Sequence, residues 1–167
     1  MLSLQSCLVE KSEGSSCLSC KDYLIDVIDN NKAYGELYGH EIGDTIITNQ
    51  SFYTNVTGFS NGDCFNTVAF NNTITILDQG VYHISAQFSF SDGANTEFHI
   101  AAGINGQRQI DCHAQRKIGT GGDVGSSSFT CIKELNATDI VTLMIENVDN
   151  VGDPEIHSVN INLVKIK

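Results

Sequence analysis

Three cysteines near the start of the chain have the clearest chemical potential. Cys7, Cys17 and Cys20 follow the pattern C-x9-C-x2-C. Two thiolates at C-x-x-C spacing can chelate a tetrahedral zinc ion, and a short segment without a core of its own could be ordered by one. A complete zinc signature supplies a fourth ligand at matching spacing, and none precedes His40. We therefore favour free thiols, or one Cys17–Cys20 or inter-subunit disulfide, over a zinc site.

The other three cysteines, Cys64, Cys112 and Cys131, lie in or beside strand-like segments, and we expect them to be small core residues. The absence of a signal-like segment at the N-terminus also argues against a disulfide framework. Cys112 and His113 are superficially a nucleophile and a base. Because neighbouring residues on a strand point to opposite faces, they do not form such a pair.

The remaining polar residues give no catalytic or metal-binding pattern. The histidines are scattered without a His-x-x-x-His or Glu-x-x-His pair: His40, His83, His99, His113 and His157. The Gly-rich stretch 119–128 lacks the lysine and following helix of a phosphate loop, and we expect it to be an exposed loop. Some turn aspartates could bind calcium, although turn chemistry is the simpler explanation: Asp92, Asp123, Asp149 and Asp153. We expect no enzyme and no resident cofactor.

Length and charge restrict the class of protein. The 167 residues are enough for one domain with a sizeable core, and 41% of them are hydrophobic. The formal net charge of -11 makes nucleic acid an unsuitable partner, since phosphate binding needs clustered positive charge. No segment of the sequence has the composition of a signal peptide or a membrane helix. We therefore expect a soluble protein made in the cytoplasm.

The hydrophobic pattern predicts strands with one short helix. Residues 19–31 repeat apolar residues at helical spacing, and everything after them reads as strands between Gly, Asn and Asp turns. Residues 80–93, "GVYHISAQFSFSDG", alternate apolar and small polar side chains, which predicts a strand with one face in the core. The Asn105–Gly106 pair is the strongest short hairpin signal. Many short strands favour an antiparallel sandwich.

The order of these segments resembles a known superfamily. "AYGELY" opens the strand region, and Gly80-x-Tyr82 and the Asn105–Gly106 hairpin follow it. A Ser-rich strand over 126–135 then precedes an Asp-x-Val opening at Asp139. Over residues 33–167 the chain resembles the trimeric jelly-roll superfamily of complement globular heads and tumour necrosis factors, and is most similar to its bacteriophage structural-protein members. It lacks the signal, collagen stalk and disulfide pattern of the animal members.

This resemblance implies an architecture and an assembly. The expected fold is an all-β antiparallel sandwich of the jelly-roll type over residues 33–167, with an N-terminal arm over residues 1–32 that contains the short helix. In this superfamily the sheet with the Gly-x-Tyr strand packs around a threefold axis. Ser85, Gln87 and Ser89 would then meet copies of themselves in a homotrimer, where charged side chains would bring three like charges together. The alternative is a solvated polar face.

The resemblance also implies a function. We expect a non-enzymatic virion structural protein, a trimeric head decoration or fibre displayed on a phage particle and assembled in the host cytoplasm. The arm over residues 1–32 would bind capsid or tail proteins. The alternative is an adhesin head of a bacterial surface or phage tail protein that binds host glycans or a receptor. Nucleic-acid binding and membrane insertion are not expected.

Overall fold

The computed structural model describes residues 32–44, 52–120, 122–148 and 153–167. The helix expected over residues 19–31 and Cys7, Cys17 and Cys20 lie outside these ranges. Within the described residues the secondary structure consists of strands and turns, and no helix there is both long and apolar enough to span a bilayer. The strands are β1 (Tyr34–Asp44), β2 (Thr54–Asn55), β3 (Ser60–Phe65), β4 (Thr67–Phe70), β5 (Thr73–Ile76), β6 (Gly80–Ser91), β7 (Glu97–Ile104), β8 (Gln107–Lys117), β9 (Val124–Leu135), β10 (Ile140–Asn147) and β11 (Glu155–Lys165).

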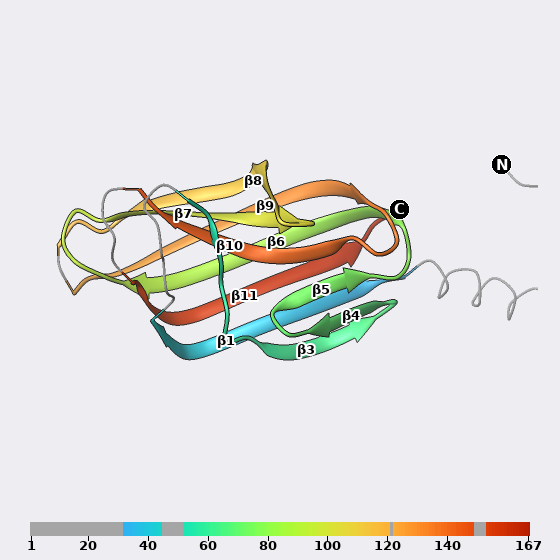
Figure 1. Ribbon diagram of the computed structural model, residues 1–167, viewed down its shortest axis with the longest axis horizontal. Coiled ribbons are helices and arrows are strands. Elements are labelled where there is room, and N and C mark those ends of the chain that lie inside the picture. Colours follow the sequence, from blue (N-terminus) through green and yellow to red (C-terminus); the bar gives the residue numbers. More distant parts are fainter. Residues whose placement is uncertain (1–31, 45–51, 121, 149–152) are drawn as a thin grey trace, which may run out of the picture. The chain divides into compact units, whose positions relative to one another are not determined.

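The strands form two antiparallel sheets that pack face to face (Figure 1). One sheet has the order β3-β1-β11-β6-β9, and the other has the order β4-β5-β10-β7-β8 with β2 beside β10. In both sheets most neighbours are distant in sequence, as in β1 with β11 and β5 with β10. This crossing connectivity is that of a jelly roll, so the predicted all-β sandwich is confirmed.

The core between the sheets follows the alternation in β6. Tyr82, Ile84, Phe88 and Phe90 are buried, and the residues between them face away from the core. The Phe90 ring lies 4.7 Å from that of Phe88 and 4.9 Å, edge to face, from that of Phe98 on β7. Aromatic contacts of this geometry add to the hydrophobic gain of burial. The core therefore fixes which face of β6 is left for other contacts.

The Gly-x-Tyr motif has a specific physical role at the start of β6. A side chain at Gly80 would place its Cβ 2.3 Å from Lys165 Cε and 2.4 Å from the Lys167 carbonyl oxygen. The Tyr82 hydroxyl donates a hydrogen bond of 2.5 Å to the Asp78 carbonyl oxygen. Lys165 Nζ lies 2.6 Å from the Asp78 carboxylate. Glycine is therefore needed for β11 to approach closely, and the tyrosine locks the preceding turn.

The predicted hairpin at residues 104–107 is confirmed. Asn105 and Gly106 have φ values of 51° and 76°, which is the conformation that Asn-Gly favours in two-residue hairpins. The Asn105 side chain donates to the Asp139 carboxylate at 2.8 Å and accepts from the Ile140 amide at 2.9 Å. These bonds attach the β7–β8 hairpin to the turn before β10. They explain why an aspartate stands directly before that strand.

Several strand predictions need correction. The stretch 52–59 is rich in aromatic and β-branched residues, which favour a strand, yet only Thr54–Asn55 pairs, as β2 beside β10. Strand β3 (Ser60–Phe65) was not predicted, because its Asn, Gly and Asp residues are typical of turns. The end of the expected loop 119–128 belongs to β9, which begins at Val124. Strand β9 pairs with β6 along its full length, so backbone pairing overrides the weak strand preference of the serines at residues 126–128.

Candidate assembly interface

The side chains of the five-stranded sheet that point away from the core form a surface that we call the open face. It consists of alternate residues of β1, β11, β6 and β9. The register places them in rows across the sheet. Two central rows are Tyr38–Asn160–Gln87–Ser128 and His40–Ser158–Ser89–Ser126.

Ser85, Gln87 and Ser89 all lie on the open face, as the alternation in β6 predicts. Small side chains on the neighbouring strands leave the surface hollowed on both sides of Gln87. One hollow of about 480 Å³ is lined by Ser85, Ala86, Gln87, Ser128, Phe129, Thr130, Asn160 and Asn162. A second, of about 420 Å³, is lined by Gln87, Phe88, Ser89, Ser126, Ser127, Ser128 and Ser158.

The centre of the open face is polar but almost uncharged. The two central rows contain no Lys, Arg, Asp or Glu in a chain whose formal net charge is -11. One row away, Glu36 accepts a hydrogen bond of 2.7 Å from Asn160 Nδ2, and Asn162 donates to Asn160 Oδ1. In a chain this acidic, a sheet face exposed to solvent would be expected to carry acidic side chains as well. This face instead presents amides and hydroxyls that can pair with identical groups.

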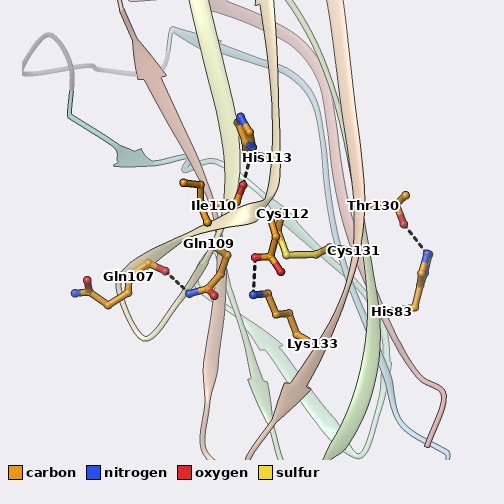
Figure 2. Close-up of a disulfide and its surroundings, with 10 residues drawn as sticks. His83, Gln107, Gln109, Ile110, Cys112, His113, Thr130, Cys131 and Lys133 are labelled. Atoms are coloured by element: carbon orange, nitrogen blue, oxygen red, sulfur yellow. Dashed lines mark hydrogen bonds and ion pairs between the residues drawn. A yellow bond between two sulfur atoms is a disulfide. The ribbon is translucent and has the colours of Figure 1, made fainter.

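A disulfide lies at the side of the sandwich, where β8 and β9 face each other from the two sheets. Figure 2 shows the bond between Cys112 on β8 and Cys131 on β9, with Lys133 beside it. The expectation that these cysteines are small core residues needs correction, because the two form a disulfide. Cys112 is buried as expected, but its sulfur is bonded across the core edge. The two residues are 19 positions apart on different sheets, so no short spacing motif signals the pair.

An ion pair lies next to the disulfide. Lys133 Nζ is 2.6 Å from an Asp111 carboxylate oxygen, and this contact lowers the pKa of Asp111. Asp111 is largely exposed, so the pair adds little stability. His113 is exposed while Cys112 is buried, which confirms that these neighbours do not form a nucleophile–base pair.

The expectation for Cys64 is also wrong. Cys64 lies on β3, where it is free and exposed and not in the core. Among the residues that the structure describes, no group of three or more His, Cys, Asp and Glu side chains could hold a metal ion. Asp92, Asp123 and Asp153 are within that part of the chain, and Asp149 is outside it. The roles predicted for Cys7, Cys17 and Cys20 stay predictions.

The six-stranded sheet carries a charged cluster that the sequence pattern did not reveal. His99 Nδ1 lies 3.2 Å from Glu146 Oε2 on β10, and His99 Nε2 lies 3.1 Å from Glu97 Oε1 on β7. Nearby, the Arg108 guanidinium lies 4.8 Å from the centre of the Tyr53 ring, and burial raises the pKa of Tyr53. His99 and Glu146 are 47 positions apart, so only the strand register brings them together. The cluster joins β7, β8 and β10 to Tyr53, the residue before β2, and we assign it a structural role.

Comparison with known proteins supports the fold. Neither the models of known protein families nor the curated proteins match this chain. Solved structures do match. Murine APRIL at pH 5.0 aligns with a TM-score of 0.57 and 18% identity, covering 80% of this chain and 99% of that one. Eiger TNF from S. frugiperda aligns with a TM-score of 0.59 and 12% identity, covering 82% and 94%.

A complement protein has the same architecture. The globular domain of zebrafish complement 1qA aligns with a TM-score of 0.56 and 13% identity, covering 81% of this chain and 98% of that domain. Similarity at this level of identity concerns the fold. The described jelly roll therefore has the fold of the tumour necrosis factor and complement globular-head superfamily, as the order of the sequence motifs predicts.

Proposed function

We propose that this chain is a non-enzymatic homotrimeric head, displayed on a bacteriophage particle as a head decoration or fibre and anchored by residues 1–32. The observation that supports assembly best is the open face, which is hollowed, rich in amides and hydroxyls, and uncharged at its centre. Such a face is self-complementary, because identical copies can approach without stacking like charges. The chain also has the fold of the tumour necrosis factor and complement heads.

The phage assignment is supported by the sequence. Its "AYGELY" opening and its Asn- and Thr-rich turns resemble phage structural proteins more than the animal members. In this proposal the chain is made in the host cytoplasm and joins the virion there, with the arm bound to capsid or tail proteins. For Cys7, Cys17 and Cys20 we propose free thiols, since an arm that is ordered on its binding surface needs no zinc.

Gln87 offers a direct test of the assembly. Gln87 lies in a central row and lines both hollows, so Gln87→Glu would bring three carboxylates together in the trimer. We expect wild type to sediment as a trimer at micromolar concentration. The variant should show a dissociation constant raised at least tenfold, about 1.4 kcal/mol or more.

A matched substitution on the other sheet is the control. Gln107 is exposed at the start of β8, and Gln107→Glu adds the same charge on the other sheet, outside the open face. It should leave sedimentation unchanged. A wild-type monomer would refute the homotrimer, and equal effects of the two variants would refute the open face as its interface.

The second candidate is an adhesin head that binds host glycans or a receptor. Exposed loops between the strands would supply its contacts, as binding residues often lie on loops held by a rigid scaffold. A reconstruction of the particle with this chain located on it would support the virion role. Binding of a glycan by the purified head, with no copy of the chain in particles, would favour the adhesin.

A further inference from the structure

One end of the open face is apolar, in contrast to its centre. The row at this end runs Phe65–Tyr34–Val164–His83–Ile132 across β3, β1, β11, β6 and β9. Four of these side chains are large, hydrophobic and exposed in the single chain, with 44% of Phe65, 41% of Tyr34, 49% of Val164 and 59% of Ile132 accessible. We call this row the apolar end. Contiguous exposed apolar groups on a sheet face are typical of interfaces.

His83 is the one residue of the apolar end with a basic side chain. Its register neighbours are Val164 and Ile132, both hydrophobic. Its Nε2 lies 2.6 Å from Thr130 Oγ1, so one ring nitrogen has a partner on β9, and Figure 2 shows the ring turned towards that hydroxyl. A neutral imidazole is well suited to this position. A protonated ring would put a charge and a second donor among apolar side chains.

We infer that a second copy of this chain covers the apolar end, and that burial of His83 there makes the assembly dissociate in acid. This inference rests on the proposed homotrimer. The partner is assigned because the apolar end is continuous, through the same four strands, with the uncharged centre of the face. The hydrophobic row supplies affinity, and the polar rows supply register.

The direction of the pH effect follows from linkage. In the separated chain the His83 side chain is exposed to water, where its protonated form is solvated. In the trimer the same form would be buried, so separated chains bind more protons than assembled ones. Mass action then shifts the equilibrium towards separated chains as the pH falls. Three copies can change the dissociation constant by up to about a thousandfold per pH unit.

The other charged groups near the apolar end do not take the place of His83 in this pH response. On β9, Glu134 is paired in register with Val81 and not with His83. On β11, the Lys165 side chain turns to Asp78. On β1, Glu36 lies in the next row and bonds Asn160. His40 is on the same face, but it lies in a central row three rows from His83.

Sedimentation of the full-length chain tests the inference at pH 7.5 and pH 5.5 and constant ionic strength. We expect the wild-type dissociation constant to rise at least about tenfold at the lower pH. His83→Gln keeps a side chain that can bond Thr130 but cannot become charged, and it should remain assembled at both pH values. His40→Gln is the matched control and should behave as wild type.

The outcomes separate the two proposals. A wild type that is monomeric at pH 7.5 refutes the homotrimer itself. A wild-type trimer with equal affinity at both pH values overturns the inference while the trimer stands. A rise in the dissociation constant at pH 5.5 that persists in His83→Gln does the same. Loss of the acid response in His40→Gln alone would move the titrating group to the polar centre of the face and overturn the role of His83.

Discussion

Tyr82 combines burial with a hydrogen bond that depends on its protonation. Its ring is buried and its hydroxyl donates to the Asp78 carbonyl oxygen at 2.5 Å. Burial raises the pKa of Tyr82 to about 12, and the nearby Asp78 carboxylate adds to the shift. The folded chain therefore prefers the neutral phenol, while an unfolded tyrosine ionises at about pH 10. This contribution to stability is complete below about pH 10 and is lost as the pH rises towards 12.

The variant Tyr82→Phe tests this at the residue scale. Below pH 10 it should unfold more easily than wild type by about 1 kcal/mol, because it lacks the hydrogen bond. Between pH 10 and pH 12 the phenol ionises in the unfolded wild type but stays neutral in the folded one, which lowers the free energy of unfolding of the wild type alone. The stability difference between the two proteins should therefore shrink. Urea unfolding at pH 8, 10 and 11 measures it. A gap that stays constant over this range would show that the Tyr82 hydroxyl does not couple folding to pH.

Individual residues were predictable where a local pattern specified them. The alternation in β6 identified both the buried side chains and the face of Ser85, Gln87 and Ser89. Partners that lie far apart were not predictable, as for His99 with Glu146 and Cys112 with Cys131. A single sequence shows which residues share a strand face, but strand register and sheet packing decide which of them meet.

At the scale of elements, the two sheets are joined by side-chain contacts and by the link between β8 and β9. The disulfide Cys112–Cys131 and the ion pair of Asp111 with Lys133 lie together at this edge. Both β8 and β9 are terminal strands of their sheets, with one neighbour each in the strand order. The disulfide there links the edges of the two sheets covalently. The strand order itself was not predictable from local patterns, and only the order of the motifs along the chain indicated it.

Reduction of the disulfide should destabilise the jelly roll. The bond closes a loop with a sequence separation of 19, for which about 3 kcal/mol of stabilisation is expected. Reductant should lower the free energy of unfolding of wild type and also of Cys64→Ala, the variant that removes the free cysteine of β3. It should leave the double variant Cys112→Ala/Cys131→Ala unchanged. Urea unfolding with and without dithiothreitol measures this free energy. A wild type with the same free energy of unfolding in both conditions would contradict the disulfide.

At the scale of the whole molecule, the fold could be predicted because several weak signals occur in the right order. The Gly-x-Tyr strand, the Asn-Gly hairpin and the Asp-x-Val opening each have a local physical reason, at Gly80, Asn105 and Asp139. Their order fits one jelly-roll topology. The proposed assembly face could be anticipated only in part, since the apolar end combines residues from five strands that are distant in sequence.

The boundary of the jelly roll leads to the last prediction. Ala33 is only 1% exposed and belongs to the core, and its carbonyl oxygen accepts a bond of 2.8 Å from the Lys165 amide. Strand β1 begins directly after it, at Tyr34. A chain that starts at Ala33, with an initiating methionine, therefore keeps the core and the open face. It should fold and sediment as the same trimer, with a thermal midpoint close to that of the full chain.

The same truncated chain should no longer attach to its particle, because residues 1–32 are proposed to form the anchor. Binding to particles that lack this protein measures attachment, and the full-length chain is the control. A truncated chain that does not fold would show that the arm contributes to the core and that the boundary at residue 33 is wrong. A folded truncated trimer that still binds particles would place the anchor on the jelly roll, where the exposed loops and the outer surface of the six-stranded sheet are the regions left to carry it.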